Sequence, residues 1–369
     1  MRLPQRILIA AQPLDGGVSS HVVSLAQALP RDRFAVEVAC PRESLTWSSL
    51  EGSDVVLHAI EPNRKPAPAD ARSLQALVRL VGRVDVVHVH SAKAGFLGRL
   101  AAVSRGRRGS CVFTPHGWSF WAATGAESRL YLELERLAAH WCRTIVALST
   151  AEREAGLEAR IGRPEQYRTI PNGVPLDRYA LKRSPVPGRI LMVGRLAPPK
   201  RPDLALRALA ELRQRDPDAE LHFAGDGPLR AESERLAAEL GVERAVQFLG
   251  TRDDVPELLA EASCALLASD YEGGPLAILE ALAAGVPVVA TDVGAVTDQI
   301  EPGRTALIAP HDDPAALAAA LEEVLSDPKR AAELGEAGRL DAQARFSLDG
   351  MVDRLAALYE ELPMARTRE

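Results

Sequence analysis

The sequence predicts an α/β protein made of two Rossmann-like domains that face each other across a cleft. The chain has 369 residues, which exceeds the roughly 250–300 residues at which a single hydrophobic core stops growing. Short β-branched runs also alternate with longer helical patterns along the whole chain, as in βαβ units with parallel sheets. We therefore expect one parallel sheet in each half, with ligands at the carboxyl ends of the strands.

The first half contains five runs that we expect to be buried strands. They are "RILIAA" (6–11), "FAVEVAC" (34–40), "VDVVHVHS" (84–91), "CVFTPHG" (111–117) and "TIVALS" (144–149). The segment "SSHVVSLAQALP" (19–30) between the first two has helical spacing. Because parallel strands need helical crossovers, this order indicates a first Rossmann-like domain.

The same pattern restarts in the second half. Its expected strands are "RILMVGRL" (189–196), "LHFAGDG" (221–227), "AVQFLG" (245–250), "CALLAS" (264–269) and "PVVATDVG" (287–294). Several of these runs are apolar on both faces, as expected for a sheet covered by helices on both sides.

A connection rich in proline and glycine, residues 171–188, separates the two patterns. We therefore predict an N-terminal domain at 1–175 and a C-terminal domain at 186–345. Residues 346–369 have the spacing of a closing helix, which either packs on its own domain or crosses back to the first.

Composition excludes several classes of protein. Apolar residues make up 47% and charged residues 25% of the chain, which rules out extensive disorder, and the net charge of −6 argues against a nucleic-acid partner. The four cysteines form no C-x-x-C pair and indicate buried thiols of a reducing cytoplasm. No apolar run approaches the roughly 20 residues that span a bilayer, and the short N-terminal run reads as a strand instead of a signal peptide. We expect a cytoplasmic protein.

Two loops that follow expected strands could bind an anion. Gly16 and Gly17 open the first helix, where glycine lets backbone N–H groups approach a phosphate. Arg195 and Lys200 in "GRLAPPK" could neutralise a diphosphate. A tight strand-to-helix turn and a solvated basic loop, respectively, are the alternative interpretations.

The segment "DYEGGPLAILE" places two glutamates on either side of a helix start. Pro275 suits the first turn of a helix, and Gly273 and Gly274 leave backbone donors exposed at its positive end. Glu272 would then lie in the preceding loop. Glu280 would lie within an apolar helix, where a charge needs a partner.

The segment "TPHGWSFWAATG" combines a histidine with three aromatic residues. His116 follows a strand, and Trp118, Phe120 and Trp121 gather there in a chain with only 4% aromatic residues. Aromatic faces stack on sugars, although a core contact is at least as common. A metal site is not expected: the pair His88 and His90 shares a strand face, but no third ligand is evident nearby.

Residues 86–126 contain no acidic side chain but hold five basic ones. These are Lys93, Arg99, Arg105, Arg107 and Arg108. This stretch suits contact with an anionic membrane surface, and an ordinary basic face is the alternative.

Taken together, these motifs resemble the retaining GT-B glycosyltransferases of family 4, also called group 1. "EGGPLAILE" matches the family's E-x7-E motif, and "DGGVSSH", "TPHG", "VGRLAPPK", "AGDGP" and "FLGTRDDV" occur in the family's order. The resemblance spans nearly the whole chain. "HVHSAKAGFLGRL" and "TPHGWSFW" are most similar to members that build exopolysaccharide or capsule.

The resemblance implies that the N-terminal domain binds the acceptor and the C-terminal domain binds the nucleotide-sugar donor, and it also implies roles for individual residues. The donor site would comprise Gly16, Gly17, Arg195, Lys200, Gly273, Gly274, Pro275, Leu276 and Glu280. Of these, the two cations would hold the diphosphate and Glu280 the ribose. Glu272 would bind the transferred sugar, and His116 would lie near it. Gly250, Thr251 and Arg252 would lie near the base, and Trp118, Phe120 and Trp121 near the acceptor.

The function that the resemblance implies is retaining transfer of a sugar from a nucleoside diphosphate sugar, with UDP favoured, to a hydroxyl acceptor. The expected acceptor is a lipid-linked saccharide, and the protein would then associate peripherally with the inner face of the membrane. Neither cofactor nor metal is expected. Catalysis would be electrostatic, with the leaving diphosphate accepting the acceptor's proton.

Three alternatives remain open at this stage. The same chemistry could glycosylate a small molecule or natural product. A UDP-sugar 2-epimerase shares the scaffold, but would not be expected to pair "GRLAPPK" with an E-x7-E motif. A non-catalytic nucleotide-sugar-binding protein would not need to keep both cations and both glutamates. A dehydrogenase is disfavoured, because no G-x-G-x-x-G follows a strand.

Overall fold

The computed structural model describes residues 3–62 and 67–363 of the chain. The chain divides into two compact units, one ending at Asn172 and joined by the segment that begins at Leu348, the other comprising Gly173–Ser347. The predicted segments 1–175 and 346–369 also include residues 1–2, 63–66 and 364–369, which lie outside the described residues.

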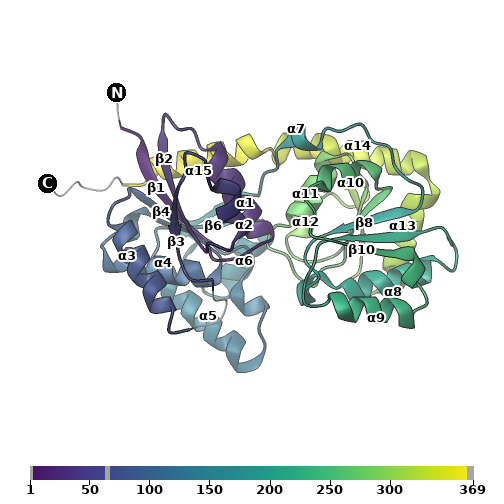
Figure 1. Cartoon of the computed structure of the whole chain (residues 1–369), viewed down its shortest axis with the longest axis horizontal. Coiled ribbons are helices and arrows are strands. Elements are labelled where there is room, and N and C mark those ends of the chain that lie inside the picture. Colours follow the sequence, from purple (N-terminus) through teal and green to yellow (C-terminus); the bar gives the residue numbers. More distant parts are fainter. Residues whose placement is uncertain (1–2, 63–66, 364–369) are drawn as a thin grey trace. The chain divides into compact units, whose positions relative to one another are not determined.

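The first unit alternates strands and helices in chain order (Figure 1). Its elements are β1 (Gln5–Ala10), α1 (Gly17–Ala28), β2 (Phe34–Cys40), α2 (Leu45–Leu50), β3 (Val56–Ala59), α3 (Asp70–Val81), β4 (Val86–His90), α4 (Ala92–Ser104), η1 (Arg108–Ser110), β5 (Cys111–Thr114), η2 (Ser119–Trp121), α5 (Gly125–Ala139), β6 (Thr144–Ala147), α6 (Thr150–Glu158), η3 (Pro164–Gln166), β7 (Tyr167–Thr169) and, from the end of the chain, α15 (Leu348–Glu361).

The second unit repeats this alternation. Its elements are α7 (Leu176–Tyr179), β8 (Arg189–Val193), η4 (Pro198–Lys200), α8 (Pro202–Leu212), β9 (Glu220–Ala224), α9 (Arg230–Glu239), η5 (Glu243–Ala245), β10 (Val246–Gly250), α10 (Val255–Glu261), β11 (Cys264–Leu267), α11 (Leu276–Ala283), β12 (Val288–Thr291), α12 (Val296–Gln299), β13 (Ala306–Ala309), α13 (Pro314–Ser326) and α14 (Pro328–Arg345).

Both sheets are wholly parallel among the described residues and have the same topology. The strand orders are β3-β2-β1-β4-β5-β6-β7 and β10-β9-β8-β11-β12-β13. In each sheet the first strand lies between the second and the fourth, so that the chain reverses direction across the sheet between β1 and β4 and between β8 and β11. A crevice for a ligand forms at the carboxyl ends of such strands. The prediction of two Rossmann-like α/β domains is thus confirmed.

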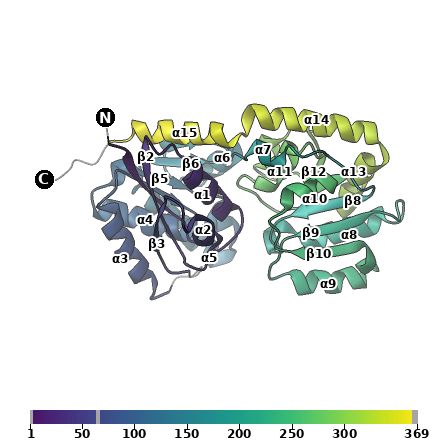
Figure 2. The ribbon, with the colours of Figure 1, turned by 45° about the horizontal axis from the view of Figure 1, so that its top comes forward.

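Helices cover both faces of each sheet. In the first unit, α1 and α15 pack over one face, and α3, α4 and α5 lie over the other (Figure 1). In the second unit, α8, α9 and α13 cover one face and α10 and α11 the opposite one (Figure 2). Strands buried on two sides read as continuous apolar runs, which explains why their sequence pattern was easy to recognise.

Three strands were not anticipated from the sequence, namely β3, β7 and β13. Each is three or four residues long and lies at the edge of its sheet. Strands this short carry little periodicity, and an edge strand such as β3 is half-exposed, so its pattern is not apolar throughout.

The helix α15 packs on the first unit. Its residues Met351, Leu355 and Tyr359, spaced by four, are buried in the core that α1 shares with β1 and β2. Its partner helix α1 contributes Val22 and Leu25 to this core.

Within 3–62 and 67–363, no helix combines the length and the apolar character required to cross a membrane.

Candidate active site

The loop that carries Arg195 and Lys200 follows β8 in the second unit and is shaped by close packing on a neighbouring turn. The N–H of Gly194 donates to the carbonyl of Ala224 (3.0 Å), and that of Leu196 to the carbonyl of Asp226 (3.1 Å). At Gly225, with φ 154°, a Cβ atom would lie 1.9 Å from the carbonyl oxygen of Gly194. Glycine is therefore required for the two loops to meet.

Lys200 and Glu272 form an ion pair at this edge of the sheet. Lys200 Nζ lies 2.5 Å from Glu272 Oε1, and the Ser269 hydroxyl donates to the same oxygen (2.6 Å). The lysine side chain is 22% exposed and the glutamate 11%. Ser269 follows β11, the strand beside β8, so the topology brings cation and carboxylate together at the point where the sheet reverses direction. Ser269 was not anticipated, because a lone serine carries no sequence signal.

A second set of contacts joins the same two loops. The N–H of Asp270 donates to the carbonyl of Pro199 (2.8 Å), and Arg201 Nη1 donates to Asp270 Oδ1 (2.7 Å). Arg201 adopts the left-handed conformation (φ 48°) and also pairs with Asp203 and Asp312. Charge-assisted contacts of this kind offset the strain of its backbone and hold the Lys200 loop against the Glu272 loop.

The helix α11 begins directly after the two glycines. It starts at Leu276, and Pro275 is its N-cap and not a residue of its first turn, which corrects the expectation for this proline by one position. No side chain caps its N-terminus. Its first N–H groups, together with Gly273 and Gly274, therefore present partial positive charge to an anion.

Glu280 lies within α11 and has a hydroxyl partner that the sequence did not reveal. Burial raises the pKa of Glu280, and a hydrogen bond from Tyr179 and the charge of Arg178 oppose this rise. The expectation that a glutamate in so apolar a helix needs a donor is met by Tyr179, from α7.

The residues predicted near the base lie at the end of β10. Gly250 has φ 71°, and Arg252 donates from Nε to Asp254 Oδ1 (2.7 Å). Beside them, a hollow of about 310 Å³ is lined by Arg178, Asp253, Asp254, Pro256 and Glu257. Thr251 is exposed.

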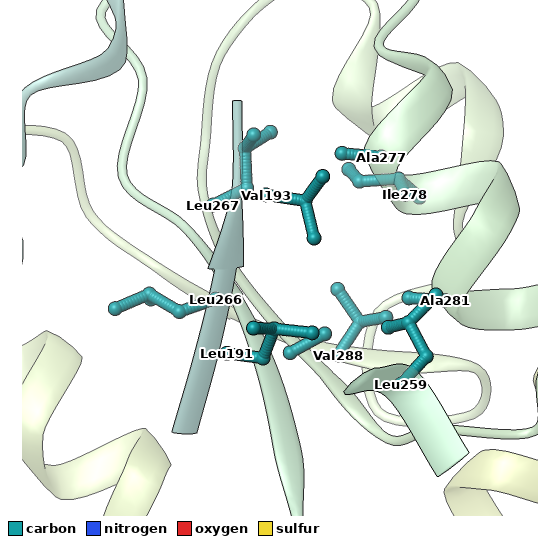
Figure 3. A pocket seen from close by; sticks show the side chains of 10 residues that line it. Leu191, Val193, Leu259, Leu266, Leu267, Ala277, Ile278, Ala281 and Val288 are labelled. Carbon is teal, nitrogen blue, oxygen red and sulfur yellow. The ribbon is translucent and has the colours of Figure 1, made fainter. Parts of the chain in front are cut away.

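A small cavity lies between α11 and the sheet (Figure 3). Its volume is about 10 Å³, and Leu191, Leu259, Ala277, Ala281 and Val288 are among its apolar lining side chains. With no polar lining side chain and no room for a sugar, it is a packing gap beneath the donor-site helix and not a binding pocket.

In the first unit, Gly16 and Gly17 stand where α1 begins. Gly16 has φ 82° and is the N-cap, Gly17 is the first helical residue, and no side chain caps this end of the helix. The loop thus has the backbone form of an anion-binding helix start, as the sequence indicated.

His116 is held in a strained turn by a buried carboxylate. Both His116 (φ 57°) and Gly117 (φ 90°) have left-handed backbones. Glu152 from α6 accepts hydrogen bonds from the N–H groups of Gly117 (2.5 Å) and Leu148 (2.7 Å), and its own carbonyl accepts from the Trp118 indole (2.8 Å). Such strain at a non-glycine residue costs about 1–3 kcal/mol and is concentrated at functional sites. Glu152 was missed because it lies 36 residues further along the chain, at no recognisable spacing.

His116 belongs to a cluster of four histidines. His90 Nδ1 and His116 Nε2 are 2.9 Å apart, and His21 Nδ1 lies 2.9 Å from Asn172 Oδ1. One ring nitrogen from each of His21, His90 and His116 lies within 4.8 Å of the other two. The prediction that the histidine pair on the fourth strand has no third imidazole nearby was therefore wrong, because α1 and the turn after β5 converge on the carboxyl end of β4.

Burial keeps these imidazoles neutral. It lowers the pKa of His21 to about 4, although the hydrogen bond to Asn172 opposes this shift. Burial, and secondarily the neighbouring rings, lowers the pKa of His88, His90 and His116 well below the ordinary range. His88 is paired through both nitrogens, with Tyr359 (2.6 Å) and Thr114 (2.8 Å), which makes it a structural residue.

Two predicted contacts are corrected by burial. The Trp118 side chain is 1% exposed and packs in the core, so it presents no face to an acceptor. Phe120 and Trp121 are half-buried, and their role near the acceptor stays a prediction. Of the predicted basic face, Arg99 is fully buried, pairs with Glu135 (2.7 Å) and cannot meet a membrane; Lys93 is mostly buried and pairs with Asp70 (2.6 Å).

Comparisons with known proteins bear on the family and the fold. The model of the family "Glycosyl transferases group 1" matches residues 178–341, and that of "Glycosyltransferase Family 4" matches residues 15–178. A mannosyltransferase of Mycolicibacterium smegmatis, GDP-mannose-dependent alpha-(1-6)-phosphatidylinositol monomannoside mannosyltransferase, is 32% identical over 89% of this chain and 90% of its own length. UDP-Gal:alpha-D-GlcNAc-diphosphoundecaprenol alpha-1,3-galactosyltransferase of Escherichia coli is 28% identical over 77% and 78%. The crystal structure of Anabaena HepE in complex with UDP and glucose superposes with a TM-score of 0.85 at 23% identity, covering 97% of this chain and 100% of that one.

Proposed function

Since the chain belongs to the group 1, or family 4, glycosyltransferases, we propose that it transfers a sugar from a nucleoside diphosphate sugar to a hydroxyl acceptor with retention of anomeric configuration. The observation that carries this proposal is the set formed by Lys200, Glu272 and Ser269 beside Arg195 and the N-terminus of α11. Two cations and an uncapped helix end suit a diphosphate, and a carboxylate suits sugar hydroxyls.

The ion pair between Lys200 and Glu272 suggests how the site changes when a donor binds. We propose that the diphosphate replaces Glu272 as the partner of the Lys200 ammonium. The released carboxylate then accepts hydrogen bonds from the sugar, while Ser269 keeps it in place. Glu280, oriented by Tyr179, accepts from the ribose hydroxyls at the other end of the donor.

The transfer step follows from this arrangement. As the glycosidic C–O bond breaks, negative charge develops on the departing diphosphate, where Arg195, Lys200 and the α11 dipole stabilise it. The acceptor hydroxyl bonds to the same face of the anomeric carbon and gives its proton to the diphosphate oxygen. These cations supply the charge stabilisation, so the step is proposed to need no metal.

We propose a UDP-sugar as donor and a lipid-linked saccharide as acceptor. The Escherichia coli relative is named for a UDP-sugar and a diphosphoundecaprenol-linked acceptor, and HepE was crystallised with UDP. The Mycolicibacterium relative is named for GDP-mannose, which makes a GDP-sugar the competing donor. On α5, Leu130 and Leu137 are 55% and 50% exposed and lie two turns apart on one helix face, which suits contact with a lipid surface.

A donor screen followed by substitution tests the proposal. UDP- and GDP-sugars are screened for thermal stabilisation and slow hydrolysis, and the productive donor is then offered with a polyprenyl diphosphate saccharide or a free sugar. Arg195→Ala and Lys200→Ala should each lower turnover by at least 100-fold, about 2.7 kcal/mol, at unchanged melting temperature. Lys329→Ala, at an 87% exposed lysine, is the matched control.

Four outcomes would count against the proposal. Near-normal turnover in both cation variants would remove the diphosphate assignment. Epimerised sugar formed from donor alone would favour the epimerase, and donor binding without any transfer would favour a binding protein. An inverted anomeric configuration in the product, read by NMR, would refute retention.

A further inference from the structure

We propose that His21, His90 and His116 form a binding site for a divalent transition-metal ion of the Zn²⁺ class. The site lies in the first unit, at the carboxyl end of β4. It is distinct from the cations proposed to act on the diphosphate, which belong to the second unit. The proposal therefore does not rest on the proposed transfer reaction.

The three rings already have the spacing of ligands around one ion. Their centroids are 5.3 Å (His21–His90), 4.9 Å (His21–His116) and 5.2 Å (His90–His116) apart. Three imidazoles on one tetrahedral ion at a metal–nitrogen distance of about 2.0–2.1 Å would place their centroids roughly 5 Å apart. The nitrogens themselves lie within 4.8 Å of one another, so a small rotation of the rings completes the convergence.

His21 offers a lone pair that has no other partner. Its Nδ1 faces the amide oxygen of Asn172 at 2.9 Å, and because this oxygen can only accept, Nδ1 carries the proton. The Nε2 atom of the neutral ring is then an unprotonated acceptor. Within the described part of the chain, this buried atom has no hydrogen-bond partner. Burying a polar atom without a hydrogen-bond partner costs about 1–3 kcal/mol of stability. A bound water or ion beside His21 Nε2 is therefore expected.

Asn172 orients His21 in the way that an oxygen acceptor usually orients a metal-binding histidine. Metal-binding imidazoles hold the second ring N–H on an oxygen acceptor, which fixes the tautomer and the direction of the lone pair. Asn172 provides such an acceptor for His21 before any metal is bound.

His90 and His116 complete the set. Their facing nitrogens are 2.9 Å apart, a separation at which one proton lies between two lone pairs. A divalent ion can take the place of that proton and bind both rings. His90 is fully buried and lies against the fully paired His88 at a centroid distance of 4.0 Å, so the strand fixes its position.

The ligand set selects the class of metal. Three neutral imidazoles suit Zn²⁺ and its neighbours, whereas Mg²⁺ and Ca²⁺ prefer oxygen ligands. Because His116 is partly exposed, a fourth position remains open to solvent, as in zinc sites with three protein ligands and a water.

A Co²⁺ titration of the full-length, tag-free protein tests the site directly. Tetrahedral Co²⁺ absorbs strongly in the visible region, whereas octahedral Co²⁺ absorbs weakly. We expect one strongly absorbing Co²⁺ per chain, displaced by Zn²⁺, and a melting temperature that rises with Zn²⁺ but not with Mg²⁺. His21→Gln, His90→Gln and His116→Gln should each remove the band, and Asn172→Ala should weaken binding roughly 10–100-fold.

His140→Gln is the matched control, because this histidine is exposed on the same unit and should leave the spectrum unchanged. If a variant at a buried histidine does not fold, His116→Gln, at a partly exposed position, still decides the question. Absence of the tetrahedral band in the wild-type protein would overturn the proposal. So would a band that persists in folded His21→Gln or His116→Gln protein, or equal stabilisation by Mg²⁺.

Discussion

Glu152→Gln should destabilise the first unit at low pH and leave it as stable as the wild type, or more stable, at high pH. Burial raises the pKa of Glu152 from 4.5 to about 7, although the Leu148 and Gly117 N–H groups oppose this rise. Because the folded-state pKa exceeds the unfolded one, the folded protein binds the proton more tightly. The free energy of unfolding contributed by this group is therefore fully present below about pH 4.5 and is lost as the pH rises through about 7.

The size of the effect follows from the two pKa values. A difference of about 2.5 units, at 1.36 kcal/mol each, corresponds to roughly 3 kcal/mol. Glutamine does not titrate, but the Gly117 and Leu148 N–H groups bond to different oxygens of Glu152, and in glutamine one of these oxygens becomes an NH₂ group that cannot accept. The other is left unsatisfied at a cost of about 1–3 kcal/mol. Glu152→Gln should thus be less stable than the wild type near pH 5 and as stable, or more stable, near pH 8.

Urea unfolding followed by tryptophan fluorescence measures this difference. All four tryptophans, at positions 47, 118, 121 and 141, lie in the first unit, so their emission reports on the unit that contains Glu152. Titrations at several pH values between about 5 and 8 give the free energy of unfolding of both proteins. Curves that stay parallel across this range would refute the reasoning, because they would show that Glu152 has the same pKa in the folded and unfolded states.

Of four further substitutions, three test packing within a unit and the fourth tests the donor site. Gly225→Ala should lower the melting temperature severely because its Cβ would overlap the Gly194 carbonyl, whereas Gly303→Ala, also at positive φ but with open space around it, should cost only about 1–2 kcal/mol; equal losses in thermal melts would contradict the clash. Arg99→Met should cost about 3–5 kcal/mol by leaving the buried Glu135 unpaired, and adding Glu135→Leu should restore much of that loss in denaturant titrations; no recovery would argue against the ion pair as the cause. Leu259→Ala should enlarge the cavity beneath α11 and cost about 3–5 kcal/mol, and a loss below 1 kcal/mol would mean that the site collapses around it. Tyr179→Phe should weaken donor binding in calorimetric titrations with little change in turnover at saturating donor, since it removes the donor that orients Glu280; unchanged affinity would remove Glu280 from the ribose site.

The sequence was most informative where burial on two sides produced unbroken apolar strands. The strands around β1 and β8 could be located for this reason, and so could the loops at their ends, which hold Gly16 and Arg195. The edge strands β3, β7 and β13 could not be located, because a run of three or four residues has too little pattern. Glu280 was inferred to need a partner from its apolar neighbours, but Tyr179 could be identified only from the fold.

By itself, the sequence determined the two Rossmann-like units and the loop chemistry at their strand ends, because local periodicity and glycine, proline and charge placement encode these directly. Only the tertiary structure decided which side chains meet. It paired Lys200 with Glu272, set Glu152 under the His116 turn, placed His21 beside His90, and buried Trp118 and Arg99 in the core. Such contacts join residues tens of positions apart through the order of strands in a sheet, and no local pattern along the chain specifies that order.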